Sequence, residues 1–205
     1  GTFELAELNY VNQYLKPGDK AIDIGANVGI FSVVMGATVG DKGQVFAFEP
    51  VATNVVRLEK NLRKNTLCNV QIYPVALGAS NGHMKLRMAT DPAYPSLHQV
   101  QGGFGSGIEV SVEVRTLDGI WEELGYPDIA LVKIDVEGAE MDVLRGASSF
   151  LARCRPALLV EANSAGELDT LRARLSDLGY RHTRPEGFSP MNHVFIFPEP
   201  TATKA

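Results

Sequence analysis

The chain has 205 residues, of which 45% are hydrophobic and 21% are charged, and its formal net charge is −5. This composition is typical of a folded globular domain and excludes a wholly disordered chain, which would combine low hydrophobicity with high net charge. It also argues against a protein that binds nucleic acid through a large basic face, although a local basic patch stays open.

The cysteines point to a reducing compartment. Cys68 and Cys154 lack the spacing of metal ligands and are too few for a disulfide framework. No apolar run reaches the roughly 20 residues that a membrane span needs. The N-terminal sequence lacks the basic start and apolar core of a signal peptide. We therefore expect a cytoplasmic location and no membrane span.

The first third of the chain alternates predicted strands and helices. Residues 20–24 read as a buried strand, followed by Gly25 and a helix over about 28–38. A second strand covers 44–49 and leads to Pro50, a residue well suited to the first turn of a helix. Such alternation is the sequence form of a doubly wound parallel sheet.

The middle of the chain departs from this pattern. Strands are predicted over 83–88 and 108–114, and the segment of about 90–107 between them is rich in Gly and Pro. That segment is too long for an ordinary connection, and long loops in compact domains are often functional. We expect it to be a mobile loop that covers a site and contacts the acceptor of a reaction.

The alternation resumes after this loop and continues to the end of the chain. We therefore expect one α/β domain over residues 1–198, with helices on both faces of the sheet, and a C-terminal tail over 199–205. The remaining predicted elements are a strand over 70–77 bent at Pro74, a helix around Trp121, a strand over 129–134, a helix over about 138–151, a strand over 157–161, a helix over about 167–180 and a last strand over 193–197.

Four predicted strands carry an acid at or near their carboxyl end. These acids are Asp23, Glu49, Asp135 and Glu161. In an open parallel sheet the carboxyl ends of neighbouring strands line one crevice, where ligands bind. Buried carboxylates are costly unless they meet donors or cations, so the four acids predict a ligand with several donors. The alternative is that each acid caps the helix that follows it.

The turn after the first strand, from Asp23 to Gly29, indicates a nucleoside ligand. Gly25 permits a tight turn with close backbone approach to a ligand, and Gly29 lets the next helix pack against the sheet. Glu49 follows Gly25 by 24 residues, near the spacing of an acid that accepts from both ribose hydroxyls.

The ligand groups that fit this turn are those of S-adenosylmethionine (SAM). A nicotinamide dinucleotide requires Gly-x-Gly-x-x-Gly, and Asn27 stands where its middle glycine would be. A P-loop is also missing. SAM has no phosphate and offers an amino group, a carboxylate, a ribose diol and an adenine amine, which Asp23, Asn27 and Glu49 match better than they match phosphates.

These residues and four further motifs give the chain a family resemblance. It resembles the class I SAM-dependent methyltransferases and, more closely, the FkbM family, over about residues 1–198. The motifs that carry the resemblance are Gly1-Thr-Phe-Glu4, the DIGANVG turn from Asp23 to Gly29, the AFEP strand end at 47–50, the TLD segment at 116–118, KIDVEGAE at 133–140 and LLVE at 158–161.

The resemblance implies a fold, a reaction and a donor site. The fold is a Rossmann-like sheet of about seven strands, mostly parallel, with the last strand antiparallel and inserted between two others. The reaction is methyl transfer from SAM, with S-adenosylhomocysteine (SAH) as product, most often to a hydroxyl of a sugar, glycan or polyketide-type molecule. The residues that it assigns to SAM are Glu4, Asp23, Gly25, Ala26, Asn27, Gly29, Glu49, Pro50, Val75, Ala76, Leu77 and Asp135. No acid stands where many class I enzymes bind the adenine amine.

Transfer to a hydroxyl also needs a general base, because the acceptor must lose its proton. The candidates are Asp135, Glu137, Glu161, His98 and Glu4. We expect no metal, since no compact set of metal-ligating residues is visible in the sequence. The residues of the predicted loop that we expect to contact the acceptor are Tyr94, Ser96, His98 and Phe104.

Three other functions stay open. A nucleic-acid methyltransferase would use the basic stretch Arg57, Lys60, Arg63 and Lys64, which reads better as a solvated helix face. The Asp135-Val-Glu-Gly turn lacks the Pro-Pro-Tyr of adenine-N6 enzymes, and neither cysteine follows a proline, as cytosine-C5 chemistry requires. A non-catalytic nucleotide-binding domain would keep the fold without turnover. A dehydrogenase is disfavoured by the glycine pattern.

Overall fold

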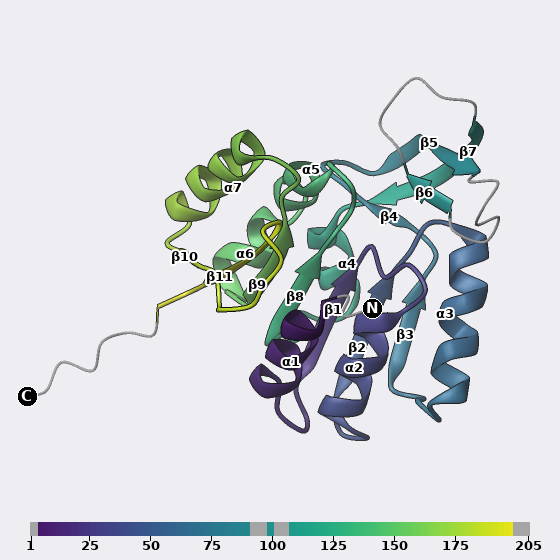
Figure 1. Ribbon diagram of the computed structural model, residues 1–205, viewed down its shortest axis with the longest axis horizontal. Coiled ribbons are helices and arrows are strands. Elements are labelled where there is room, and N and C mark those ends of the chain that lie inside the picture. Colours follow the sequence, from purple (N-terminus) through teal and green to yellow (C-terminus); the bar gives the residue numbers. More distant parts are fainter. Residues whose placement is uncertain (1–3, 91–97, 101–106, 199–205) are drawn as a thin grey trace, which may run out of the picture.

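A seven-stranded sheet organises the computed structural model, which describes residues 4–90, 98–100 and 107–198 (Figure 1). β11 is antiparallel to both neighbours, β9 and β10, while the other pairings are parallel. This arrangement confirms the mostly parallel sheet with an inserted antiparallel last strand. The strands, in spatial order, are β10 (Arg181–Thr183), β11 (Asn192–Ile196), β9 (Ala157–Glu161), β8 (Leu131–Ile134), β1 (Lys20–Ile24), β2 (Gln44–Phe48) and β3 (Val70–Tyr73).

Helices cover both faces of this sheet, as its apolar strands require. One face packs against α1 (Leu5–Tyr14), α2 (Ile30–Val39) and α3 (Ala52–Lys64). The other face packs against α4 (Leu117–Glu123), α5 (Glu140–Arg145), α6 (Ser148–Arg153) and α7 (Ala165–Asp177). Successive strand residues alternate between the two cores: Ala21 belongs to the α1–α2 side and Ile22 to the α4–α7 side.

A second, four-stranded sheet adjoins the carboxyl end of the first sheet (Figure 1). The predicted strand over 70–77 breaks at Pro74, so that β3 stays in the main sheet and β4 (Ala76–Leu77) enters the second one. The other strands of the second sheet are β7 (Gly107–Arg115), β5 (Gly82–Thr90) and β6 (His98–Val100).

The prediction of one loop over 90–107 is wrong in part. β5 extends to Thr90, and residues 98–100 form β6, which pairs antiparallel with β5. Residues 91–97 and 101–106 lie outside the described part of the chain, and so does the tail over 199–205. That residues 1–198 form a single domain stays a prediction.

The helix predicted over 138–151 is two helices, α5 and α6, separated at Gly146. A Cβ at this position would collide with the backbone carbonyl of Gly78, so only glycine fits here. α6 starts anew because the Asp118 carboxylate accepts the backbone N–H of Ser149 (3.0 Å) and Phe150 (2.8 Å). Among the described residues, no helix combines the length and apolar character that crossing a membrane would take.

Candidate active site

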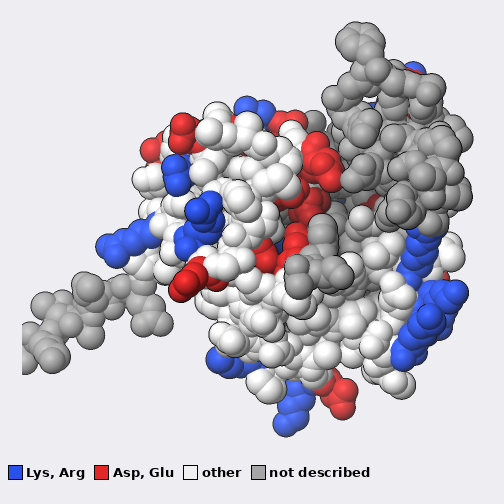
Figure 2. Space-filling view, viewed as in Figure 1, with Lys and Arg blue, Asp and Glu red and all other residues white. Residues whose placement is uncertain are grey.

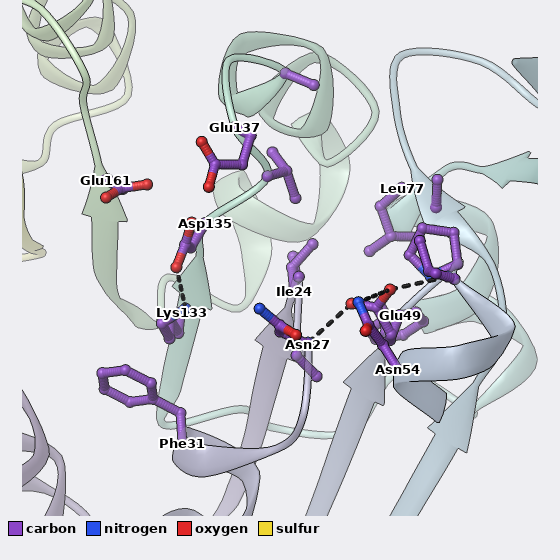
Figure 3. Close-up of a pocket in the computed structure, with 18 of the residues that line it drawn as sticks. Ile24, Asn27, Phe31, Glu49, Asn54, Leu77, Lys133, Asp135, Glu137 and Glu161 are labelled. Carbon is purple, nitrogen blue, oxygen red and sulfur yellow. Dashed lines mark hydrogen bonds and ion pairs between the residues drawn. The ribbon is translucent and has the colours of Figure 1, made fainter. Parts of the chain in front are cut away.

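A cavity of about 470 Å³ opens at the carboxyl ends of β1, β2 and β8 (Figure 3). Its size is that of a site for a small molecule or cofactor. One end is walled by Phe48, Pro50, Val75, Ala76 and Leu77, and Met84 and Leu86 of the second sheet close that side. The other end holds Lys133 and the acids Glu4, Asp135, Glu137 and Glu161.

The turn from β1 to α2 forms the floor between the two ends. The backbone N–H groups of Gly25 and Ala26 both donate to the carbonyl of Phe48, at 3.0 Å, which fastens the turn to β2. Gly25 has φ +78°, and a Cβ there would collide with the carbonyl of Asp135. The glycine is therefore required by the close approach of two strand ends, an approach that the sequence interpretation had assigned to a ligand.

Glu49 follows β2 directly and accepts hydrogen bonds from this turn. Its carboxylate takes the backbone N–H of Asn27 at 2.8 Å, the N–H of Val51 at 2.8 Å and the side-chain amide of Asn54 at 3.3 Å. Burial raises the pKa of Glu49, while the two N–H donors and Asn54 act to lower it. The bond to Val51 is the helix-capping role that the sequence left open, and a carboxylate has about four acceptor positions, so capacity remains for a ligand hydroxyl.

Two residues predicted to touch the donor do not line the cavity. Asp23 is fully buried, and its Oδ2 accepts from the Ser32 hydroxyl at 2.6 Å, so it lies beneath the turn. Gly29, with φ +89°, packs against Leu58 of α3, so it serves helix-helix contact where we had predicted packing on the sheet. The structure therefore does not support direct contact of Asp23 or Gly29 with a ligand.

The other residues assigned to the donor line the cavity. They are Glu4, Gly25, Ala26, Asn27, Glu49, Pro50, Val75, Ala76, Leu77 and Asp135.

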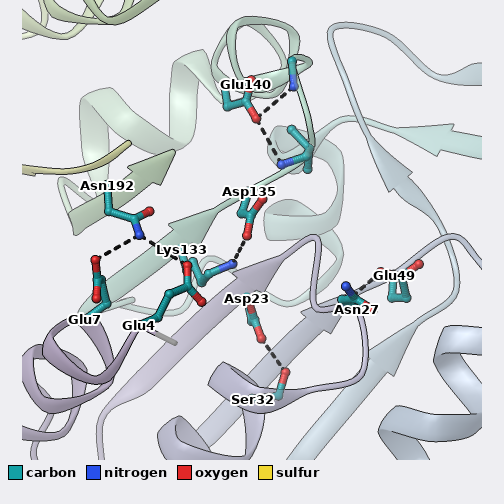
Figure 4. Close-up of polar contacts among 12 residues, drawn as sticks. Glu4, Glu7, Asp23, Asn27, Ser32, Glu49, Lys133, Asp135, Glu140 and Asn192 are labelled. Atoms are coloured by element: carbon teal, nitrogen blue, oxygen red, sulfur yellow. Dashed lines mark hydrogen bonds and ion pairs between the residues drawn. The ribbon is translucent and has the colours of Figure 1, made fainter. Parts of the chain in front are cut away.

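The acidic end of the cavity is built on β8 and β9 (Figure 3), and Figure 4 shows the contact of Asp135 with Lys133 there. The Lys133 ammonium lies 2.9 Å from Oδ2 of Asp135. Lys133 is register-paired with Leu159, and side chains alternate along a strand, so Asp135 and Glu161, two residues further along, are on the same face. Carboxyl oxygens of Asp135, Glu137 and Glu161 all lie within 4.8 Å of one another.

Acidic side chains gather near the centre of the face shown in Figure 2. The expectation of no metal rested on the absence of a compact acid set, and that reasoning was wrong, because the fold brings Asp135 and Glu137, from the turn after β8, together with Glu161 at the end of β9. That the reaction needs no metal stays a prediction. Its reason is now that the Lys133 ammonium already neutralises part of the negative charge of these three acids.

The carboxyl groups of Asp135 and Glu161 differ in acidity because only one of them is paired with Lys133. Burial acts to raise the pKa of Asp135, but the Lys133 ammonium and the hydrogen bonds from Glu161 and Lys133 outweigh it, and the net shift is downward. Burial and the hydrogen bond to ionised Asp135 raise the pKa of Glu161 to about 8. At neutral pH the pair therefore holds one proton, on Glu161.

Two further acids differ in their contacts. Glu4 is half-buried at the cavity, accepts from the Asn192 amide at 3.3 Å, and has a pKa raised chiefly by burial. Glu140 is fully buried and does not line the cavity; it accepts from the N–H groups of Val136 (3.1 Å) and Gly138 (3.2 Å) and holds the turn after β8 in place.

The predicted acceptor contacts are not placed. Tyr94, Ser96 and Phe104 lie outside the described residues, and His98 is described only as backbone in β6. Its assignment as a general base stays a prediction. The other four candidate bases all line the cavity: Glu4, Asp135, Glu137 and Glu161.

Sequence reasoning missed several cavity residues, among them Phe31, Asn54, Met84 and Lys133. Lys133 had a detectable signal, since it is the basic residue in the otherwise apolar run Ile129 to Ile134. Met84 had none, because strand alternation alone does not reveal which sheet covers a site.

Comparison with known proteins accords with this geometry. The model of the methyltransferase FkbM domain matches residues 23–182. The chain belongs to the FkbM methyltransferase family. Its fold is that of the class I SAM-dependent methyltransferases, as the resemblance implied.

Individual relatives are moderately similar. The methyltransferase sdnD of Sordaria araneosa is 28% identical over 193 residues, which cover 80% of this chain and 74% of the relative. The 2-O-methyltransferase NoeI of Sinorhizobium fredii is 27% identical over 68% of this chain and 62% of its own length. The crystal structure of methyltransferase FkbM from Methylobacillus flagellatus has a TM-score of 0.62 at 19% identity, over 93% of this chain and 50% of that one. This chain thus spans between half and three quarters of the length of these three proteins.

Proposed function

We propose that this FkbM-family chain transfers a methyl group from SAM to a hydroxyl of a sugar, glycan or polyketide-type small molecule. The observation that carries the proposal is the two-ended cavity, with a carboxylate and apolar walls at one end and an acidic cluster at the other. The hydroxyl acceptor is also supported by the relative NoeI, which is a 2-O-methyltransferase.

The cavity fits the chemical groups of SAM. Glu49, already oriented by two backbone N–H groups and the Asn54 amide, has acceptor capacity left for a ribose hydroxyl. Pro50, Ala76 and Leu77 offer apolar surface for the adenine ring. The acids Glu4 and Asp135 at the opposite end favour the positively charged sulfonium and amino group.

The reaction needs alignment and removal of one proton. SAM supplies a methyl group on a positively charged sulfur, and the carbon–sulfur bond breaks as the acceptor oxygen takes the methyl, leaving SAH as a neutral thioether. The acceptor proton passes to Glu161, the more basic member of the Asp135–Glu161 pair, in the fraction of molecules in which Glu161 has already released its own proton to solvent. A base whose pKa lies near the working pH combines an adequate unprotonated fraction with driving force for proton transfer.

Partners and location follow from the same features. We propose a small-molecule or glycan acceptor and no nucleic acid. The cavity wall is acidic at the reacting end, and Arg63, one of the basic residues of α3, is already paired with Glu59 on the exposed surface. We also propose a cytoplasmic location, consistent with two free cysteines in the described chain.

The proposal is tested by measuring SAH release from SAM over three acceptor pools: sugars and glycolipids, polyketide alcohols, and tRNA. Each pool is run with and without EDTA, and Asp135→Ala is the variant expected to lose turnover while staying folded. Product in the sugar or polyketide pool, unaffected by EDTA, supports the proposal. Product with tRNA alone overturns it, and so does failure of the chain to bind SAH by calorimetry. Loss of activity in EDTA would overturn the metal-independent mechanism.

A further inference from the structure

The buried lysine of the cavity, Lys133, has no assigned role. Its side chain is 5% exposed, and it sits in β8 among Leu131, Val132 and Ile134, which are all buried. It is the one basic residue among the described residues that line the cavity. An isolated buried ammonium would cost several kcal/mol, so its neighbours must compensate it.

The neighbours of Lys133 are carboxylates and an aromatic ring. Its Nζ lies 2.9 Å from Asp135 and 4.6 Å from the centroid of the Phe31 ring (Figure 3). Asp23 is its register partner on β1, and the two side chains face the same core. Burial acts to lower the pKa of Lys133, but the charges of Asp135 and Asp23 outweigh it and the net shift is upward, so the ammonium is charged.

Stability alone is a weak explanation for this arrangement. Buried ion pairs are often matched or exceeded in stability by apolar residues of similar volume, because desolvation offsets the attraction. The lysine stands two residues before the acid that it contacts, and that acid shares a hydrogen bond with Glu161. The contact therefore determines the charge state at the reacting end of the cavity.

We propose that Lys133 is a positioning residue: its ammonium holds Asp135 ionised and oriented, so that the proton of the Asp135–Glu161 pair resides on Glu161. This inference rests on the proposed function for its catalytic meaning. In this proposal Lys133 acts through Asp135 and Glu161.

Among the described residues, the other charged groups around this pair are acidic. Removal of the ammonium therefore leaves these carboxylates without a cation in the described part of the chain, and such a cluster binds protons more tightly. The groups that face Lys133 and its partners are Asp23 from β1, Glu4 ahead of α1, Glu137 from the turn after β8 and Glu161 from β9.

The direct test is an NMR titration of the carboxyl carbons in the full chain, with the Glu161 signal assigned by Glu161→Gln. In the native chain Glu161 is expected to titrate near pH 8. In Lys133→Met its titration should move to higher pH by about one unit, a tenfold change in proton affinity. An unchanged Glu161 titration in Lys133→Met overturns the proposal, whether or not the chain shows methyl transfer.

The catalytic arm is the pH profile of kcat. Lys133→Met should shift the rising limb to higher pH by the same amount, whereas a merely structural lysine would lower kcat equally at every pH. Lys133→Arg keeps the positive charge and should return the rising limb of the kcat profile toward its native pH. This variant also keeps the inference testable if Lys133→Met misfolds. Lys42→Met, at an exposed lysine in the turn before β2, is the matched control. If the rising limb of kcat lies at the same pH in Lys133→Met as in the native chain, the inference is contradicted.

Discussion

At the scale of single residues, three cavity residues adopt a backbone conformation that is unusual for non-glycine residues. Glu4, Asn27 and Glu137 have φ values of 53°, 50° and 55°. Such conformations cost of order 1 kcal/mol or more and persist where the surroundings impose them. Here the imposing contacts include the bond from Asn27 N–H to Glu49 and the bond from Asn192 to Glu4. The backbone of Asn27 is thus held by a cavity side chain, Glu49, while Glu4 is held by Asn192, which lies outside the cavity lining.

Glu49 offers the sharpest test of this preorganisation. Glu49→Ala should weaken SAH binding by about 1–3 kcal/mol, the range for a lost hydrogen bond to a charged group, because the ribose loses its acceptor and Asn27 N–H loses its partner. Calorimetry measures the effect. The control is Glu59→Ala, at an exposed acid of α3, the helix that follows Glu49, and this variant should bind SAH with native affinity. Equal affinities in both variants would contradict the ribose assignment.

At the scale of elements, the start of α2 is set by its contact with α3. Gly29 and Gly18 have similar φ values, +89° and +94°, but different surroundings. A Cβ on Gly29 would collide with the Leu58 side chain, whereas a Cβ on Gly18 would meet nothing within 4 Å. Comparing substitutions at Gly29 and Gly18 therefore distinguishes the cost of backbone strain from the cost of disturbed helix packing.

Gly29→Ala should lower the free energy of unfolding more than Gly18→Ala does. The glycine-to-alanine change at positive φ costs about 1 kcal/mol or more at both sites, and the clash with Leu58 adds about 1–3 kcal/mol at position 29. Urea unfolding gives both values. In a Leu58→Ala background, where the obstacle is removed, the excess at position 29 should disappear. An equal cost at the two sites would show that α3 does not constrain this helix.

Much of the fold was predictable from such local patterns. The apolar runs predicted every strand of the main sheet except β10, which has three residues, two of them exposed. α1 was also missed, because its buried face includes Glu7, which accepts from Ser189 N–H (2.7 Å) and Asn192 (3.0 Å) near the far end of the chain. Partners so distant in sequence leave no local signal.

The candidate site was predictable where it depended on strand ends and not where it depended on strand order. Glu49, Asp135 and Glu161 were identified because each closes an apolar run. Asp23 was assigned to the ligand because the sequence does not show that β1 pairs with β8, which brings Lys133 beside it. The same missing information hid the contacts of Lys133 and the closeness of Glu161 to Asp135 and Glu137.

At the scale of the whole molecule, a histidine pair at one edge of the main sheet links stability to pH. His193 of β11 is 3% exposed, and its Nδ1 lies 3.1 Å from Nε2 of His182 on β10. Burial, then the nearby His182 and the charges of Arg184 and Arg172, lower the pKa of His193 to about 4. The folded chain therefore keeps His193 neutral at pH values where the unfolded chain, with an ordinary pKa near 6.5, has protonated it.

Because the unfolded state binds the extra proton, this histidine removes stability as pH falls from about 6.5 toward 4. Between pH 7.5 and 5.0 the loss attributable to His193 should be about 2 kcal/mol. His193→Asn removes the titration and keeps a polar partner for His182, so its free energy of unfolding should fall less over this interval than that of the native chain. Urea unfolding at the two pH values measures the difference. His83→Asn, at an exposed histidine of β5, should retain the native pH dependence. If His193→Asn also retained the native pH dependence of the free energy of unfolding, the acid sensitivity of the fold would arise from other residues. The sheet edge formed by β10 and β11 would then not be the pH-dependent element of the fold.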